Sequence, residues 1–241
     1  MAKEFLFASW EGGGNIPPML TLARRLLDRG HRVRVLGDDA SAEEIRQAGA
    51  EFRPWRTAPN RPDRMPESDP HKDWEIEDPR ELLPLLLETQ VTGPALAHAT
   101  DVIEELKARP ADAVIAGDLQ LGPLVGAEAA SVPQAILSCN IPCLPRAGIP
   151  PFGPGLTPAE NEQDRRLQEQ IGAGFGALFD AGLAPLNEAR MKLGLKPVET
   201  VIEQLHRPAL HLVASAEAFD FPTSEQPANL RSVGPLLDPP G

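Results

Sequence analysis

The segment that follows the first predicted strand has the residue types best suited to hold a ligand. Gly12, Gly13 and Gly14 stand in a row just before a predicted helix. Glycines let the backbone approach a ligand closely, and the first turn of a helix presents N–H groups that have no partner within the helix. Trp10 and Glu11 precede the glycines and add an aromatic face and a carboxylate that could act as a base. We therefore predict ligand contacts along this loop.

Two interpretations rest on these glycines alone. A dinucleotide fingerprint requires G-x-G-x-x-G, which Gly12 and Gly14 begin, and Asp38 or Asp39 lies near the distance expected of a ribose partner. However, Pro17 stands where the third glycine should let helix and strand pack closely, which disfavours an NAD- or FAD-dependent enzyme. The other interpretation is a tight turn without a ligand.

The cysteines and histidines offer few further sites. Cys139 and Cys143 have no other cysteine or histidine within ten residues, so we predict pocket or loop lining and no metal site. His98 lies in the middle of a predicted helix and could face a cleft, and His71 lies in a polar loop that could fold over a ligand. The remaining three histidines are expected to be structural: His31, His206 and His211.

Composition narrows the classes of partner. The 241 residues carry a formal net charge of −12, spread along the chain, which argues against nucleic acid and against anionic membrane surfaces. No apolar run is long enough for a membrane-spanning helix, and the apolar run near the start is too short for a signal peptide. We expect a cytoplasmic protein without membrane insertion, whose partner is a small molecule or another protein.

The hydrophobic pattern alternates short apolar runs with helical segments. Strands are predicted at residues 5–9, 31–36, 51–54, 112–116, 134–138 and 210–214, and helices at 17–29, 41–48, 80–109, 122–130, 159–193 and 198–205. The helical pattern at 80–109 is interrupted by Pro84 and by Gly93-Pro94, and the one at 159–193 is broken near Pro185. This order predicts an α/β fold, a Rossmann-like parallel sheet with helices on both faces. Ligands on such sheets bind at the carboxyl ends of the strands, which here lead into loops 10–16, 37–40, 117–122 and 139–158.

Four segments in order resemble the UDP-glycosyltransferase-like superfamily, and most of all its bacterial natural-product and macrolide members. Residues 14–23 read GNIPPMLTLA and 26–33 read LLDRGHRV, against the family's G-H-x-x-P-x-L-x-L-A and L-x-x-R-G-H-x-V. Residues 110–118 (PADAVIAGD) and 127–133 (AEAASVP) resemble its fourth-strand segment. Residues 229–235 (NLRSVGP) resemble its N-x-x-x-V-G-P stretch before the linker between two domains.

The resemblance implies a single N-terminal half of a GT-B fold. Residues 1–235 would form an acceptor-binding domain and 236–241 the start of an interdomain linker. The nucleotide sugar would be a co-substrate, held mainly by a C-terminal domain or partner chain whose motifs this sequence does not contain. No other cofactor is implied, and the chain by itself is expected to be inactive.

The resemblance also implies catalytic positions. In the family, a histidine in the first loop takes the proton of the acceptor hydroxyl, and an aspartate after the fourth strand orients it. Asp118 matches the aspartate, whereas Asn15 stands where the family has histidine, and an amide is no useful base. Asp118 could act as the base directly or through water, the acceptor could be as acidic as a phenol, or the protein could be impaired or a helper. Without the resemblance, Asp118 could simply cap a helix.

The loop at 140–158 is the predicted acceptor wall, because its apolar residues carry few charges. Such surfaces suit hydrophobic small molecules, although ordinary packing would also explain the aromatics. The leading interpretation is thus an inverting glycosyltransferase domain for a hydrophobic natural-product aglycone, and the alternative is a non-catalytic small-molecule-binding or helper protein. The predicted wall residues are Asn140, Ile141, Cys143, Leu144, Ile149 and Phe152, with Trp10, Trp55 and Trp74 as further aromatic faces.

Overall fold

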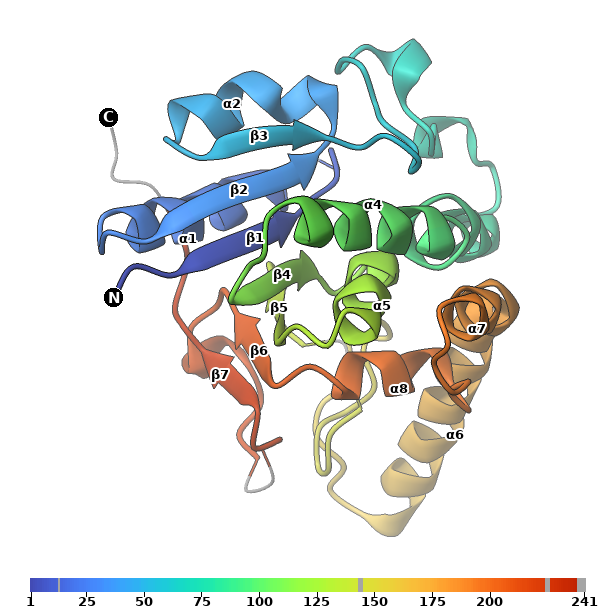
Figure 1. Ribbon diagram of the computed structural model, residues 1–241. Coiled ribbons are helices and arrows are strands. Elements are labelled where there is room, and N and C mark those ends of the chain that lie inside the picture. The colour runs from blue at the N-terminus through green and yellow to red at the C-terminus, as the bar shows by residue number, and fades with distance from the viewer. Residues whose placement is uncertain (13, 143–144, 224–225, 238–241) are drawn as a thin grey trace.

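The computed structural model describes residues 1–12, 14–142, 145–223 and 226–237. Its centre is a seven-stranded sheet in the order β3-β2-β1-β4-β5-β6-β7, in which every neighbouring pair is parallel (Figure 1). The strands are β1 (Glu4–Ala8), β2 (Arg32–Gly37), β3 (Glu51–Pro54), β4 (Ala113–Gly117), β5 (Gln134–Ser138), β6 (Leu210–Val213) and β7 (Leu230–Ser232). The predicted parallel α/β sheet is therefore confirmed.

Helices cover both faces of the sheet, because parallel neighbours need long crossover connections. The helices are α1 (Ile16–Leu27), α2 (Ala42–Gln47), α3 (Leu82–Leu86), α4 (Ala95–Ala108), α5 (Leu121–Ala129), α6 (Glu162–Phe179), α7 (Leu183–Lys192) and α8 (Val201–His206). In Figure 1, α4 and α5 lie in front of the sheet and α1 lies behind it.

Alternate strand residues build two separate cores. Leu6 and Val114 belong to the core shared with α4, α5, α7 and α8, whereas Phe7 and Ile115 belong to the core shared with α1 and α2. This alternation follows from the two-residue period of a strand. Leu236 returns to the α1 side and is buried in that second core.

The helices α4 and α5 pack unusually closely. A Cβ atom at Gly122 would lie 2.6 Å from the Ala95 carbonyl oxygen, and one at Gly126 would lie 2.7 Å from that of Ala99. No larger side chain fits there without displacing backbone, which explains why α5 is rich in small residues. The close packing sets the position of the segment that joins β4 to α5.

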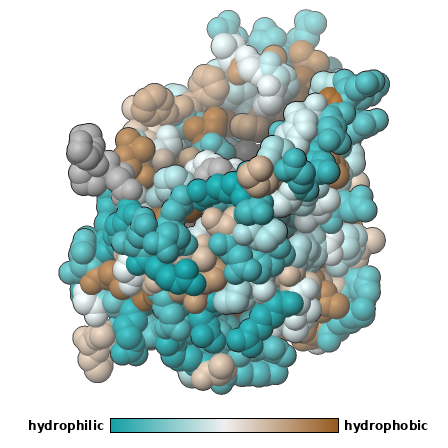
Figure 2. All heavy atoms as spheres, turned by 90° about the horizontal axis from the view of Figure 1, so that it is seen from above, coloured by the Kyte–Doolittle hydropathy of each residue, from teal (hydrophilic) through white to brown (hydrophobic). Residues whose placement is uncertain are grey.

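The outer strand β3 forms one edge of the sheet. Its residues include the charged Glu51 and Arg53 and end at Pro54, and none of the four is fully buried. Charges and proline on an edge strand discourage pairing with a second chain. Figure 2, seen from this side, shows a surface on which hydrophilic residues predominate.

The structure changes several predicted boundaries. The predicted interruption of 80–109 at Gly93-Pro94 is confirmed, whereas Pro84 lies within α3, which runs into a π-helical turn at Leu87–Val91 before α4. The predicted break in 159–193 lies at Asp180–Gly182, a few residues ahead of Pro185. Strand β7 was not predicted. Ser41 and Glu44 have the spacing of a capping box, but the Ser41 hydroxyl donates to Glu11 Oε2 at 2.8 Å and caps no helix.

None of the described helices combines the length and the apolar character that a membrane span needs.

Candidate functional site

The carboxyl ends of the strands meet along one edge of the sheet, where the loop after β1 is closed by Asn15. Asn15 Nδ2 donates to the Trp10 carbonyl oxygen at 2.9 Å, and Asn15 Oδ1 is buried without a hydrogen-bond partner among the described residues. Gly12 lies against the Trp10 ring, since a Cβ there would come within 2.3 Å of it. Gly14 is exposed with open space around it, and Gly13 lies outside the described residues.

Asp118 follows β4 and is held by the neighbouring strand. The Ser138 hydroxyl, at the end of β5, donates to Asp118 Oδ2 at 2.6 Å, and Ser138 Oγ lies 2.6 Å from His211 Nε2 on β6. Burial raises the pKa of Asp118 above its ordinary value, although the Ser138 hydrogen bond opposes the shift. Asp118 does not cap α5, whose N-cap residue is Gln120.

Cys139 links the two predicted catalytic positions. Its thiol donates a long hydrogen bond to the Asn15 carbonyl oxygen, with 3.7 Å between sulfur and oxygen. Burial and the nearby charge of Asp118 raise the pKa of the same thiol to about 11. The loops after β1 and β4 therefore meet at Cys139, although no hydrogen bond in the described structure joins the side chains of Asn15 and Asp118.

The Glu11 carboxylate accepts hydrogen bonds from other parts of the protein. Its Oε2 accepts hydrogen bonds from Ser41 Oγ at 2.8 Å and from Arg64 Nη2 at 2.8 Å, and its backbone N–H donates to Asp38. A carboxylate paired with a guanidinium is a weak proton acceptor. This arrangement disfavours the predicted alternative role of Glu11 as a base.

The polar loop at 57–79 folds back over the first loop. The His71 ring stacks edge-on against Trp10 with 5.5 Å between centroids, and Arg64 reaches Glu11. Burial lowers the pKa of His71, while Asp69 opposes that shift. His98 is buried beside Trp55 and Gln120, and burial lowers its pKa to about 4. Trp10, Glu11 and His98 line a small cavity of about 110 Å³ at this place.

A larger cavity, of about 940 Å³, lies between the loop after β5 and helix α6. Ile141, Ile149 and Phe152 line it as predicted, whereas Asn140 is exposed and is not part of its lining. Cys143 and Leu144 lie outside the described residues. Phe175 and Phe221 also line the cavity and were not predicted.

Helix α6 is poorly covered by the rest of the chain. Of its 18 residues only Phe179 is buried. It extends away from the sheet below α7 in Figure 1, so its cavity-facing residues border open space. The Phe175 ring lies 6.4 Å from that of Phe152 across the cavity wall and 5.1 Å from that of Phe179.

Arg146 forms a polar part of the same wall. Its side chain is only 2% exposed and its Nη2 lies 2.6 Å from Asp220 Oδ2. Arg146 Nε and Nη1 have no hydrogen-bond partner among the described residues. The lining therefore combines apolar side chains with this buried ion pair and with polar residues of α6, namely Arg165, Gln168 and Glu169.

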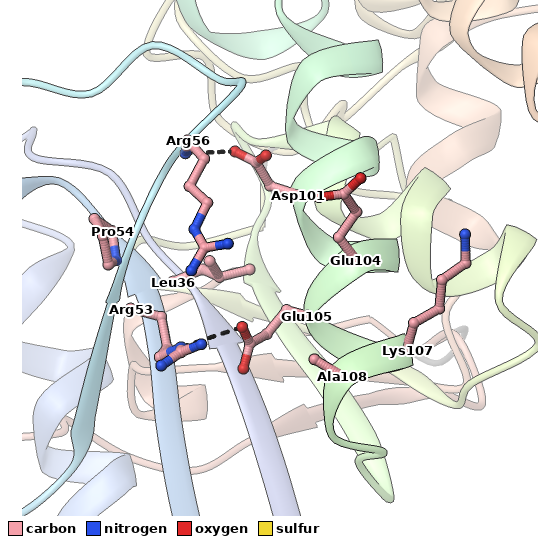
Figure 3. A pocket seen from close by; sticks show the side chains of 9 residues that line it. All are labelled: Leu36, Arg53, Pro54, Arg56, Asp101, Glu104, Glu105, Lys107 and Ala108. Carbon is pink, nitrogen blue, oxygen red and sulfur yellow. Dashed lines mark hydrogen bonds and ion pairs between the residues drawn. The ribbon is translucent and has the colours of Figure 1, made fainter.

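A third cavity, of about 370 Å³, lies between β3 and α4 (Figure 3). Two of its carboxylates have partners: Asp101 accepts the backbone N–H groups of Arg56, Thr57 and Ala58, and Glu105 pairs with Arg53 at 3.2 Å. These contacts fasten the end of β3 to α4, which is a structural role.

The histidines predicted to be structural divide into two kinds. His31 lies at the amino edge, where its Nδ1 accepts the Lys3 N–H at 3.2 Å, and His206 is exposed at the end of α8. His211 instead belongs to the Asp118 cluster. Sequence reasoning missed His211 and Ser138 because they stand 93 and 20 positions from Asp118 (211 − 118 and 138 − 118) and carry no motif.

No family model matches the chain. It is 24% identical to 4'-demethylrebeccamycin synthase of Lentzea aerocolonigenes over 254 aligned positions, which cover 99% of this chain and 57% of that protein. UDP-glycosyltransferase 2 of Phaeomoniella chlamydospora is 27% identical over 142 positions, which cover 56% of this chain and 31% of that one. The chain thus spans about half the length of the first of these relatives.

Solved structures agree with this partial match. The calicheamicin glycosyltransferase CalG4 superposes with a TM-score of 0.62 at 19% identity, covering 97% of this chain and 53% of that one. The kitacinnamycin glycosyltransferase superposes with a TM-score of 0.61 at 18% identity, covering 100% of this chain and 53% of that one. The chain has the fold of the N-terminal half of a GT-B glycosyltransferase. The carboxyl edge of this GT-B half carries the Asp118 cluster and opens into the loops that line the cavities.

Proposed function

We propose that this GT-B half is the acceptor-binding domain of an inverting glycosyltransferase that moves a sugar from a nucleotide donor to a hydrophobic natural-product aglycone. The observation that carries the proposal is the position of Asp118, an aspartate with a raised pKa at the carboxyl edge, next to the loop after β5 that lines the large cavity. The name of one relative, UDP-glycosyltransferase 2, supports the class of reaction.

The large cavity suits a hydrophobic acceptor. Its volume of about 940 Å³ lies within the range of small-molecule sites, roughly 300–1,000 Å³. Aromatic and proline side chains make up much of the lining, and Arg146 with Asp220 supplies a polar anchor. A flat aglycone packed against Phe152 and Phe175 would bury apolar area on the cavity wall.

Asp118 is the best candidate for the base. An acceptor hydroxyl must lose its proton as it attacks the sugar, and a base whose pKa lies nearer the working pH is more effective. Burial moves the pKa of Asp118 in that direction. The Asn15 side chain closes the first loop by its hydrogen bond to Trp10, and an amide cannot take a proton. Among the three explanations for an asparagine at this position, we therefore favour the one in which Asp118 itself acts as the base.

The donor side of the reaction would require a second domain. The chain spans 57% of 4'-demethylrebeccamycin synthase, and the nucleotide sugar would bind mainly to the part outside this match. We accordingly expect no transfer by the 241-residue chain alone.

Acceptor binding can be tested with two matched glycine variants in α6. Gly172 lines the cavity and a Cβ there would lie 3.9 Å from Pro151, whereas Gly174 faces open space. Gly172→Leu should weaken binding of a flat phenolic probe, such as a flavonol, by about fivefold or more in isothermal titration calorimetry, the scale of overpacking by 1–3 kcal/mol. Gly174→Leu should leave binding unchanged. Equal affinity in both variants would place the acceptor elsewhere.

A transfer assay separates the enzyme from the alternative, a non-catalytic binding or helper protein of the same fold. Nucleotide sugar and the flavonol are incubated with the chain, with a GT-B donor-binding domain, and with both. Product formed only with both supports the enzyme. Stimulation of an already complete glycosyltransferase, with no product from the combined halves, would support the helper.

A further inference from the structure

Ser138 joins Asp118 to His211 in a buried chain of hydrogen bonds. Its side chain is fully buried, and Ser138 Oγ lies 2.6 Å from both Asp118 Oδ2 and His211 Nε2. The three residues come from the neighbouring strands β4, β5 and β6 or the residue just after them. Ser138 lies two residues beyond Ile136, the register partner of His211, so both side chains are on the same face of the sheet.

The positions of the protons follow from the count of donors. Burial, with the positive charges of His206 and Arg146, lowers the pKa of His211 to about 4, so the ring is neutral near pH 7 and carries one N–H. A serine hydroxyl has one proton. When Asp118 is ionised, Ser138 donates that proton to Asp118 Oδ2, and the bond to His211 must then be made by an N–H on Nε2. His211 therefore directs the Ser138 proton toward Asp118.

The charged surroundings distinguish this cluster from an ordinary structural carboxylate. Glu128 pairs with Arg190 at 2.8 Å and with Arg207 at 2.7 Å. Burial acts to raise the pKa of Glu128, but the hydrogen bonds from the two arginines outweigh burial and lower that pKa to about 2. No cation pairs with Asp118 in the described part of the chain; its titratable neighbours there are the Cys139 thiol and, beyond Ser138, the His211 ring, and both are neutral near pH 7. Arg146 is near His211 but is bound to Asp220.

We propose that Ser138 and His211 are positioning residues, which hold one oxygen of the Asp118 carboxylate so that the other receives the proton of the acceptor hydroxyl. This rests on the proposed function. In the step itself, the acceptor O–H bond breaks and its proton passes to Asp118. The acceptor oxygen forms a bond to the anomeric carbon of the nucleotide sugar. The bond from that carbon to the diphosphate breaks, and the diphosphate leaves with the electron pair.

Carboxyl and imidazole NMR on the 241-residue chain tests the arrangement directly. In the unmodified protein, ¹⁵N shifts of His211 should show the Nε2–H tautomer at pH 7. Asp118 should titrate at a higher pH in Ser138→Ala, because the ionised carboxylate loses a hydrogen bond, and Ser138→Thr should restore the original value. His211→Gln keeps a donor near the Nε2 position and should shift Asp118 less than His211→Leu does.

The same variants are then assayed for transfer with the donor-binding domain added. Ser138→Ala should lower kcat by about tenfold or more with little change in KM and move the acidic limb of the pH profile, as expected for a hydrogen bond to a charged group. An Nδ1–H tautomer in the unmodified protein, or an Asp118 titration that none of the variants moves, would overturn the positioning role even if a variant folds poorly. Full transfer by Asp118→Asn would instead overturn the proposed function while leaving the NMR result standing.

Discussion

The two edges of the same sheet hold buried charge in opposite ways. At the amino edge, the fully buried Arg34 pairs with Glu4 at 2.6 Å and with Glu105 at 3.0 Å, and it also donates to the Arg109 carbonyl oxygen. At the carboxyl edge, Asp118 has hydrogen bonds but no cationic partner among the described residues.

The difference is visible in the pKa values of the two carboxyl groups. Burial acts to raise the pKa of Glu4, but hydrogen bonds from Arg32 and Arg34 outweigh it and hold the pKa below its ordinary value. Burial raises the pKa of Asp118, and the hydrogen bonds from the Ser138 hydroxyl and from the backbone N–H groups of Asp118 and Leu119 do not compensate. A buried carboxylate that is paired with cations stays ionised without destabilising the fold. A buried carboxylate without a cationic partner lowers stability and can take a proton more readily. Such strongly shifted carboxyl groups are typical of functional sites.

The largest effect should come from Asp118→Asn. If the unmatched carboxylate is the base, transfer in the presence of the donor-binding domain should fall by about 10²–10⁴, the usual contribution of general-base catalysis. The matched control is Asp112→Asn, at the amino end of the same strand, where the carboxylate is exposed and bound to Lys3. That control should keep full activity. Equal activity of the two variants would remove the functional distinction between the edges.

At the amino edge, Arg34→Ala should be strongly destabilising. Removing one member of a buried ion pair leaves the remaining carboxylates uncompensated and costs about 3–5 kcal/mol in the free energy of unfolding. Arg32→Ala removes an arginine whose side chain is 72% exposed and which pairs with the same Glu4, so it should cost less than about 1 kcal/mol. Urea denaturation measures both, and similar losses would contradict the role given to burial.

The two carboxyl groups should give pH dependences of opposite sign. The folded-state pKa of Glu4 is lowered, so its stabilisation is complete above the unfolded-state pKa and is lost as the pH falls through the folded value. The folded-state pKa of Asp118 is raised, so its ionisation destabilises the fold as the pH rises through the folded value.

Glu4→Gln should therefore lower the thermal midpoint at pH 7 and have little effect near pH 2. Asp118→Asn should raise stability at pH 7, within the roughly 0.5–2 kcal/mol common for stabilising substitutions, and have little effect near pH 2. Calorimetric scans from pH 2 to pH 8 provide the comparison. Destabilisation at pH 7 by Asp118→Asn would mean that the carboxylate is structural after all.

The smallest effect on transfer is expected from Asn15→Ala, which tests whether Asn15 at the carboxyl edge has more than a structural role. Loss of its hydrogen bond to the Trp10 carbonyl should reduce transfer by no more than about tenfold, the scale of one neutral hydrogen bond. Gly176→Ala in α6 is the control, because a Cβ there meets open space and Gly176 does not line the large cavity. A loss as large as that of Asp118→Asn would show that Asn15 participates in the chemistry itself.

Much of the fold follows from local sequence patterns. Short apolar runs and helix-spaced leucines placed six of the seven strands and the surrounding helices, because strand and helix periodicities are local properties. The interruption predicted at Gly93-Pro94 within 80–109 is confirmed, since α4 begins only at Ala95. The π-helical turn at Leu87–Val91 was not predicted, and a Cβ at Gly93 would lie 1.7 Å from the Glu88 carbonyl oxygen in that turn. Hydrophobic spacing does not report such a contact.

The candidate site was predicted only in part. Asp118 was singled out by the family resemblance, and the wall residues Ile141 and Phe152 by the distinctive composition of their loop. Glu11 was considered as an alternative base, but its carboxylate accepts hydrogen bonds from Arg64, which is 53 positions away in a loop whose path the sequence does not specify. Asn15 remains a predicted catalytic position, and its side chain also closes the first loop by donating to the Trp10 carbonyl oxygen.

The sequence by itself determined the strand–helix alternation, and thereby the sheet and the edge at which its loops gather. Only the tertiary structure decided which side chains meet there. Ser138 and His211 reach Asp118 because β5 lies between β4 and β6, and the order of strands in a sheet depends on how crossovers pack and not on any local pattern. The same packing places two carboxylates beside Arg34 and no cation of the described residues beside Asp118. The partners of a buried charge depend on which residues are its neighbours in the folded structure.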